Sequence, residues 1–208
     1  MTGQQGSREE KHEGEEKRSY QKYLKILLDR LLALVGTAAL SWLLLGVGIA
    51  VRLDSPGPVL FRQKRVGRNG QYFYIYKFRT MRIDTPHDMP THLLNHPEFL
   101  YHKSRTLSQE TSLDELPQLF NILKGDISIV GPRPVMEVET EIYGNYRDML
   151  LSVKPGLTGF WAANGRSCTT YTRRRAMEIC YIKNRSVCFD LKIILKTITS
   201  VFKGEGAV

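Results

Sequence analysis

One stretch of this chain restricts its folding more than any other, because Leu31–Val51 contains no charged side chain. The stretch holds about 21 residues and would extend about 31 Å as a helix, enough to cross the apolar core of a bilayer. A helix buried in a soluble protein is the alternative, but a chain of 208 residues has little other apolar mass to cover it. We therefore expect a membrane-embedded helix within residues 20–53.

The orientation of this helix is a separate problem, because both of its flanks are basic. The flanking cations are Lys17, Arg18, Lys22, Lys25 and Arg30 before the run, and Arg52, Arg62, Lys64, Arg65 and Arg68 after it. The positive-inside rule then gives no direction for a simple span. A re-entrant helix, which enters and leaves on one face, satisfies both flanks but needs a break. The run has no proline, so its weak points are Gly36, Ser41, Gly46 and Gly48, and a full span stays open.

Residues 1–19 are polar and mixed in charge, which is typical of a disordered segment. Residues 54–208 alternate strand and helix signals, so we expect a small α/β (α+β) domain. Two strands, Val59–Val66 and Tyr72–Met81, are separated by Asn69-Gly70, a strong hairpin-turn signal.

Three further segments complete the expected domain. Residues 82–110 contain three prolines and four histidines, which favours a loop. Ile127–Val130 is typical of a short buried strand. The last helix, from about Asp190 to Phe202, has one apolar stripe, which either lies on a membrane surface or packs on the domain.

The net charge of +9 indicates an anionic partner. Nucleic acid, anionic lipid and phosphorylated substrates all meet that requirement. The cations form no recognition stripe and no nucleic-acid-binding motif is present, so nucleic acid is disfavoured. The three cysteines are scattered, which favours reduced thiols over a disulfide framework or a zinc site.

Two adjacent acids, Asp114 and Glu115, are the candidate catalytic residues. Ser112 and Glu115 have capping-box spacing, and Gly125 is placed to end the helix that would follow. In a first helical turn the dipole favours the ionised carboxylate, so Asp114 would be available as a nucleophile. Adjacent side chains point about 100° apart, which suits one acid attacking while the other holds a metal ion. Helix capping alone is the alternative for both acids.

Cations that could hold a phosphate lie in three places. Lys77 and Arg79 are two apart on an expected strand and would face one side, although a solvated sheet edge has the same pattern. Arg133 lies between two prolines that restrict its backbone, and its planar guanidinium matches phosphate oxygens. Arg166, after Gly165, is a further candidate.

Four blocks occur in an order that resembles the bacterial sugar transferases, the monotopic polyprenyl-phosphate phosphoglycosyl transferases. The blocks are Lys77-Phe-Arg-Thr-Met81, Ser112-Leu-Asp-Glu-Leu-Pro-Gln118, Gly131-Pro-Arg-Pro134 and Lys154-Pro-Gly-Leu-Thr-Gly159. The resemblance covers about residues 24–203. It implies that residues 54–208 form a catalytic domain on the cytoplasmic face of the bacterial inner membrane, with a re-entrant helix and amphipathic interfacial helices.

The resemblance also implies a two-step reaction. The carboxylate at Asp114 attacks the sugar-attached phosphorus of a UDP-sugar, UMP leaves, and undecaprenyl phosphate accepts the sugar phosphate. Glu115 is associated with Mg²⁺, and Lys77, Arg79 and Arg133 match the cations that such a reaction needs. Asp190 matches an acidic position typical of the family. Membrane lipid is the expected surrounding, a homodimer stays open, and we expect a minimal form without a large N-terminal membrane domain.

Three departures from the family pattern leave an alternative open. Ser41-Trp42 stands where the family often has Ser-Pro, Gln109 stands where it commonly has arginine, and Trp161-Ala162 replaces its usual Trp-Gln. The stretch before Gln109 also looks shortened. A catalytically weakened member that serves as a membrane scaffold in polysaccharide assembly would fit these changes.

Overall fold

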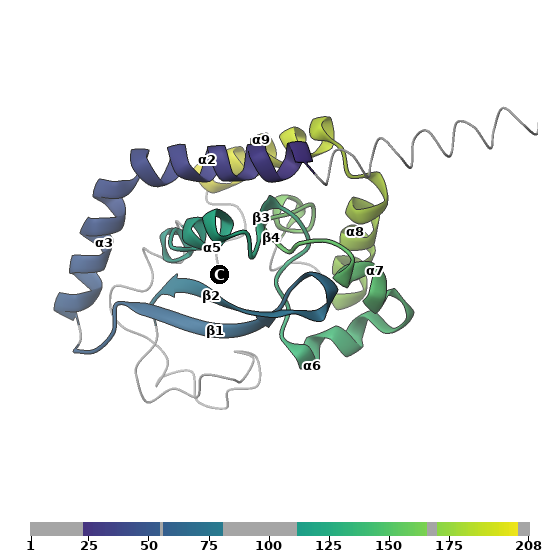
Figure 1. Cartoon of the computed structure of the whole chain (residues 1–208), viewed down its shortest axis with the longest axis horizontal. Helices are drawn as coiled ribbons and strands as arrows, with labels where there is room; N and C mark the ends of the chain where they lie inside the picture. The colour runs from purple at the N-terminus through teal and green to yellow at the C-terminus, as the bar shows by residue number, and fades with distance from the viewer. Residues whose placement is uncertain (1–22, 55, 81–111, 166–169, 204–208) are drawn as a thin grey trace, which may run out of the picture.

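The computed structural model describes residues 23–54, 56–80, 112–165 and 170–203 (Figure 1). Its helices and strands are α2 (Lys25–Ala39), α3 (Ser41–Asp54), β1 (Leu60–Val66), β2 (Tyr72–Phe78), α5 (Gln118–Lys124), β3 (Ser128–Val130), α6 (Glu137–Thr140), α7 (Arg147–Leu151), β4 (Gly156–Thr158), α8 (Tyr171–Asn184) and α9 (Val187–Lys203). This mixture of helix and strand confirms the predicted class of fold. The expected disordered segment 1–19 and the expected loop 82–110 lie outside the described residues.

The long uncharged run forms two helices rather than one. Helices α2 and α3 meet at Leu40 with a bend of 64°, and α3 turns down one side of the domain (Figure 1). Among the described residues, no single helix has the length and apolar composition to cross a bilayer, whereas α2 and α3 meet that test together as a bent pair. The break lies next to Ser41, one of the weak points predicted from the sequence.

Two hydroxyl side chains explain a bend without proline. Thr37 Oγ1 donates to the carbonyl of Ala33 at 2.7 Å, and Ser41 Oγ donates to the carbonyl of Ala38 at 2.9 Å. Hydroxyls that bond back to the preceding turn compete with the helical N–H groups and bend helices. The bend therefore has a local chemical cause that requires no proline.

Two layers stack beneath α2. Helix α2 packs on α5 through Ala33, Leu119 and Ile122, and α5 packs on the hairpin of β1 and β2 (Figure 1). The two strands are antiparallel, with Leu60 opposite Phe78 and Val66 opposite Tyr72. The predicted hairpin is confirmed. Asn69 and Gly70 both adopt positive φ in its turn, the conformation that this residue pair favours.

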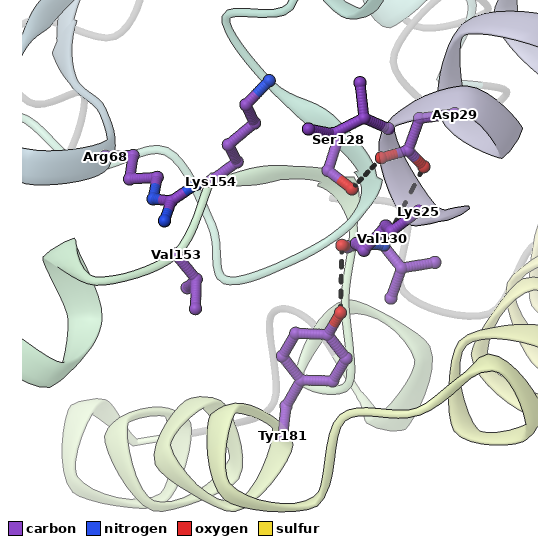
Figure 2. A pocket seen from close by; sticks show the side chains of 9 residues that line it. Lys25, Asp29, Arg68, Ser128, Val130, Val153, Lys154 and Tyr181 are labelled. Atoms are coloured by element: carbon purple, nitrogen blue, oxygen red, sulfur yellow. Dashed lines mark hydrogen bonds and ion pairs between the residues drawn. The ribbon is translucent and has the colours of Figure 1, made fainter. Parts of the chain in front are cut away.

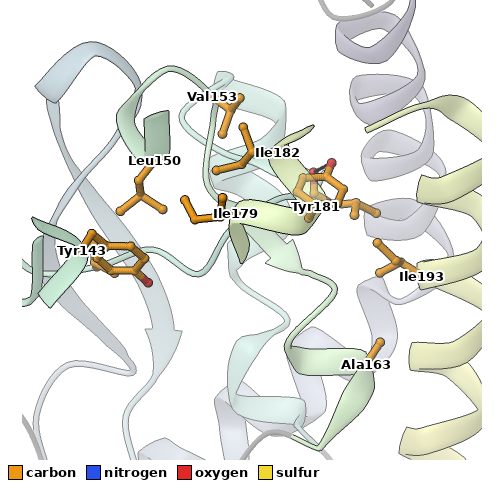
Figure 3. Packing of buried hydrophobic residues seen from close by; sticks show 10 residues of the cluster. Tyr143, Leu150, Val153, Ala163, Ile179, Tyr181, Ile182 and Ile193 are labelled. Carbon is orange, nitrogen blue, oxygen red and sulfur yellow. Dashed lines mark hydrogen bonds between the residues drawn. The ribbon is translucent and has the colours of Figure 1, made fainter. Parts of the chain in front are cut away.

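A second core lies beside these layers. Strands β3 and β4 pair in parallel, with Ser128 opposite Gly156 and Val130 opposite Thr158. Around them pack α7, α8 and α9 through buried apolar side chains, as Figure 3 shows. The cluster comprises Val130, Val135, Tyr143, Leu150, Val153, Ala163, Ile179, Tyr181, Ile182 and Ile193.

Buried polar contacts attach α2 to this second core. Asp29 accepts hydrogen bonds from Ser128 Oγ at 2.6 Å and from the amide of Ile129 at 3.2 Å. Lys25 Nζ lies 2.5 Å from Asp190 Oδ2 in α9, and the hydroxyl of Tyr181 donates to Asp190 Oδ1 at 2.8 Å. These contacts set the position of α2, because a buried charge is tolerated only when its partner stays in place.

The apolar stripe of α9 does not pack entirely on the domain. Leu191, Leu195 and Ile198 are each about half exposed, whereas Asp190 and Ile193 point inward. Helices α2 and α3 are also apolar on the outside, with large exposed side chains at Leu27, Leu31, Leu34, Trp42, Leu45, Ile49 and Leu53. We call these outward residues of α2, α3 and α9 the apolar face. A face of this size marks an interaction surface.

The Asp190 contacts give a first prediction. The Asp190→Asn substitution removes the nearer of the two carboxylates at the buried ammonium of Lys25, since Asp29 lies at 3.8 Å and Asp190 at 2.5 Å, and we expect it to lower the free energy of unfolding by about 3 kcal/mol. Denaturant unfolding in detergent measures this. Asp148→Asn, which removes an exposed carboxylate, serves as the matched control and should change little. A variant at Asp190 with wild-type stability and weakened substrate binding would contradict the structural role.

Candidate active site

Asp114 and Glu115 lie in a short 3-10 turn, Leu113–Glu115, and not in the first turn of a helix. Ser112 takes a left-handed conformation, with φ of 57°, and its side chain caps no helix, so the predicted capping box is wrong. The helix α5 starts only after Pro117, which has no N–H and restricts its own backbone to values compatible with a helix start. The predicted helix end is confirmed, since Gly125 caps α5 with φ of 90°.

A lysine from the hairpin faces both carboxylates. Lys77 Nζ lies 2.7 Å from Glu115 Oε1 and 3.8 Å from Asp114 Oδ2. The side chains of Lys77 and Glu115 are each about 30% exposed, whereas that of Asp114 is only 11% exposed. The ammonium therefore provides the positive charge next to Asp114 that the helix dipole was expected to provide.

One buried amide sets this arrangement. Asn121, which is fully buried in α5, accepts a hydrogen bond from the amide of Tyr76 at 3.0 Å. Its own Nδ2 donates to the carbonyl of Tyr74 at 2.7 Å and to Asp126 at 3.0 Å. The helix is thus attached to the backbone of β2 one residue before Lys77. This attachment brings the acids ahead of α5 to the ammonium on β2.

Arg133 is presented by two loops that approach very closely. A Cβ built on Gly156 would lie 2.1 Å from the nitrogen of Gly131, so a side chain cannot fit there. Gly131 donates to the carbonyl of Thr158 at 2.9 Å, and Gly156 donates to that of Pro132 at 2.8 Å. The Gly-Pro-Arg-Pro and Lys-Pro-Gly-Leu-Thr-Gly blocks are therefore two halves of one structure, which exposes the side chain of Arg133.

Trp161 and Glu178 hold the residues around Arg133. The backbone amide of Arg133 donates to Glu178 Oε1 at 3.1 Å, and Glu178 also accepts from the hydroxyl of Tyr143. The Cζ atom of Arg133 lies 5.5 Å from the ring centre of Trp161, and that of Arg174 lies 4.9 Å from the same ring. Both guanidinium groups are thus within the range of a cation–π attraction to the same aromatic ring.

Two arginines that act electrostatically together with Arg133 were not predicted as site residues, namely Arg65 and Arg174. Burial lowers the pKa of Arg65 to about 10 although Glu139 opposes the effect, and the charges of Arg133 and Arg174 lower it further. The carboxylate of Glu115 also acts on Arg65. The arginines and the acids thus share one electrostatic environment, in which Arg65 is paired with Glu139 at 3.1 Å and Arg174 with Glu178 at 3.5 Å.

The sequence does contain a signal for each of these arginines. Strand alternation in β1 places Arg65 on the side of Phe61 and Gln63, away from the exposed Arg62 and Lys64. Arg174 precedes Glu178 by four residues on α8, the spacing of an ion pair on one helix face.

The remaining predicted residues are not brought to the carboxylates by the described contacts. The buried guanidinium of Arg79 donates to the carbonyl of Pro56 at 3.0 Å. Asp190 is buried between Lys25 and Tyr181 and serves the attachment of α2. Arg166 and Gln109 lie outside the described residues.

The donor set at the acids suits Mg²⁺. Within the described ranges, no group of three or more His, Cys, Asp or Glu side chains is arranged around a possible metal position. Asp114 and Glu115, however, both approach one cation, Lys77, so their carboxylates converge on one region. Mg²⁺ is commonly held by one or two carboxylates together with substrate phosphates. The two acids therefore fit an ion that is completed by a phosphorylated substrate.

Comparisons with known proteins agree on one family. The bacterial sugar transferase family profile matches residues 20–204. An exopolysaccharide production protein of Sinorhizobium fredii is 37% identical over 194 residues, which cover 86% of this chain and 85% of that protein. The undecaprenyl-phosphate galactose phosphotransferase of Salmonella typhimurium is 36% identical, covering 89% of this chain and 42% of the relative.

A third relative is the UDP-glucose:undecaprenyl-phosphate glucose-1-phosphate transferase of Xanthomonas campestris. It is 34% identical over 202 residues, which cover 93% of this chain and 42% of the relative. This chain thus spans most of the Sinorhizobium protein but less than half of the two named transferases.

The contacts of Asn121 give a second prediction. Asn121→Ala leaves the amide of Tyr76 and the carbonyl of Tyr74 without their side-chain partner in a buried place. We expect the free energy of unfolding to fall by about 3 kcal/mol. Thermal unfolding compared with Asn145→Ala, a truncation at an exposed asparagine, isolates the effect. Equal stability of the two variants would show that the attachment of α5 to β2 does not depend on this amide.

Proposed function

The chain belongs to the bacterial sugar transferase family, and from this premise we propose that it transfers a sugar phosphate from a nucleotide sugar to a polyprenyl phosphate. The Salmonella and Xanthomonas relatives are named for activities of this class. The observation that carries the proposal is the convergence of Asp114 and Glu115 on Lys77, near a group of arginines.

The proposed reaction has two displacements at one phosphorus. A carboxylate oxygen of Asp114 attacks the sugar-attached phosphorus of a UDP-sugar, and an O–P bond forms as the P–O bond to UMP breaks. UMP leaves with the electron pair of that bond. An oxygen of undecaprenyl phosphate then attacks the same phosphorus, which releases Asp114 and gives the lipid-linked sugar diphosphate.

Positive charge is the main requirement of such a step, because an anionic carboxylate must approach an anionic diphosphate. The ammonium of Lys77 already contacts both acids and can donate to a phosphate oxygen when the substrate binds. Arg133 is exposed and adds a planar donor group suited to phosphate. Mg²⁺ held by Glu115, when bound, would add neutralising charge at the diphosphate. Asp114 is the more buried acid, which suits the nucleophile.

The apolar face gives the proposed site its location. Helices α2 and α3 expose large apolar side chains on both sides of the bend, and α9 adds a third apolar surface. We place this face in the cytoplasmic membrane with the acids on the cytoplasmic side, since cations flank both ends of the uncharged run. An acceptor whose polyprenyl chain lies in the bilayer could then present its phosphate to a site at the surface.

The assignment of the nucleophile gives a third prediction. With Mg²⁺ and a UDP-sugar but no acceptor, the wild-type protein should release UMP once per chain and gain the mass of one sugar phosphate. Asp114→Asn should abolish both signals and lower turnover by at least about 1,000-fold. A mass spectrum of the intact protein and a UMP assay measure these effects. Asp148→Asn is the control for charge loss.

Two outcomes would contradict the proposal. Wild-type turnover in Asp114→Asn would reject Asp114 as the nucleophile. No UMP release by the wild-type protein across uridine, guanosine and thymidine diphosphate sugars would favour the scaffold alternative.

The exposed guanidinium gives a fourth prediction. Arg133→Ala should leave the protein folded, because only the backbone of Arg133 is bonded to Glu178. Turnover should fall about 100-fold or more, as for other losses of a donor that stabilises developing charge. Arg173→Ala removes an exposed arginine on α8 and should retain activity. Full activity of the Arg133 variant would exclude it from phosphate binding.

A further inference from the structure

A polar cavity lies under the first half of α2, built by residues other than the two acids and their lysine. It has a volume of about 400 Å³ when the solvent at its mouth is included. Its polar lining consists of Lys25, Asp29, Arg68, Ser128, Lys154 and Tyr181. Figure 2 shows two groups of side chains, with Asp29, Ser128 and Lys25 together and with Arg68 and Lys154 apart from them.

The first group is satisfied within the protein. Asp29 accepts from Ser128 and the amide of Ile129, and Lys25 is paired with Asp190. These contacts attach α2 to the domain. They leave little capacity for a ligand on that wall of the cavity.

The second group is cationic and lacks such partners. Within the part of the chain that the structure describes, the side chains of Arg68 and Lys154 make no hydrogen bond or ion pair, and neither does that of Arg30 on α2. A Cβ built on Gly125 would lie 3.2 Å from Arg30 Nη2 and 3.4 Å from Lys154 Nζ, so both cations approach one point. We call Arg30, Arg68 and Lys154 the cation cluster.

The electrostatics of Lys154 agree with this geometry. Burial lowers its pKa, and the charges of Arg30 and Arg68 lower it further. Asp29 and Asp126 act in the opposite direction but do not compensate, since the net shift is downward. Asp29 is already bonded to Ser128, and Asp126 accepts from Asn121. The cation cluster is therefore short of negative charge.

The position of the cation cluster along the chain indicates which ligand supplies the missing negative charge. Arg30 is the last charged residue before Leu31–Val51, so it lies where the uncharged, outwardly apolar part of α2 begins. If α2 is embedded in a membrane, Arg30 lies at the depth of the lipid headgroups. Guanidinium and ammonium groups that converge at this level match a phosphate with a net negative charge.

We propose that the cation cluster binds the headgroup phosphate of an anionic membrane lipid, at a site separate from Asp114 and Glu115. The bound phosphate would bridge α2, the turn of the β1–β2 hairpin and the loop before β4. It would thereby hold the bent helix pair at a set depth relative to the catalytic domain. The inference rests on the proposed membrane placement and not on the proposed chemistry.

The test uses the full chain in nanodiscs of zwitterionic phosphatidylcholine, with and without anionic phosphatidylglycerol. The readout is the midpoint of thermal unfolding, since a ligand that binds only the folded state raises it. We expect phosphatidylglycerol to raise the wild-type midpoint by about 2–4 °C. The Arg68→Gln, Lys154→Gln double variant should lose most of that rise. The matched control is Arg62→Gln, Lys64→Gln, which removes two exposed cations of the hairpin.

Each outcome decides the proposal. A rise that is lost in the cluster variant and kept in the control supports it. An equal rise in both variants overturns it, because general attraction to a charged surface would then suffice. If inorganic phosphate added to phosphatidylcholine discs gives the same rise, and phosphatidylglycerol adds nothing, the cluster holds free phosphate and the lipid assignment is wrong.

The proposed membrane placement is tested by the same samples. Protein that does not co-purify with nanodiscs of either composition would contradict the placement itself. Protein that is retained in the discs but shows no lipid-dependent rise would contradict only the headgroup site. Neither comparison depends on catalytic turnover, so failure of the proposed chemistry would not affect either result.

Discussion

The buried ion pair between Lys25 and Asp190, next to the hydrogen bonds of Asp29, is the contact on which the rest of the structure depends. It holds an otherwise apolar helix, α2, against a domain whose own core lies around β3, α8 and α9. Since α2 also packs on α5, and α5 is attached to β2 through Asn121, the position of α2 is transmitted to the acids ahead of α5. Helix α2 and the site thus form one continuous packing.

Charge is distributed to suit an anionic nucleophile that acts on an anionic substrate. Asp114 and Glu115 face Lys77 directly, while Arg65 and Arg174 are paired with Glu139 and Glu178. Arg133 is the exposed guanidinium of this group, and its planar donor set suits phosphate oxygens. The guanidinium groups of Arg133 and Arg174 both lie against the ring of Trp161. The proposed ligand of the cation cluster beneath α2 is a second phosphate, that of a lipid headgroup.

The bend in the apolar run shows how one geometry can follow from different residues. At Leu40 the helix turns by 64° without proline, and the hydroxyls of Thr37 and Ser41 bond to the carbonyls of the preceding turn. The bend gives α3 a direction different from that of α2 and leaves apolar side chains on the outside of both. A bent, outwardly apolar pair with cations at both ends is suited to enter and leave a membrane on one side.

The sequence by itself determined the features that depend on neighbours along the chain. Positive φ at Asn69, Gly70 and Gly125, the hairpin, the strand at Ser128–Val130, the last helix and the break beside Ser41 follow from local propensity and periodicity. Only the tertiary structure decided which charges meet. It moved the start of α5 beyond Pro117, placed Asp190 against Lys25, and brought Arg65 and Arg174 to Arg133. Residues so far apart in the chain carry no mutual signal in local pattern, because their interaction energy exists only after the cores have packed.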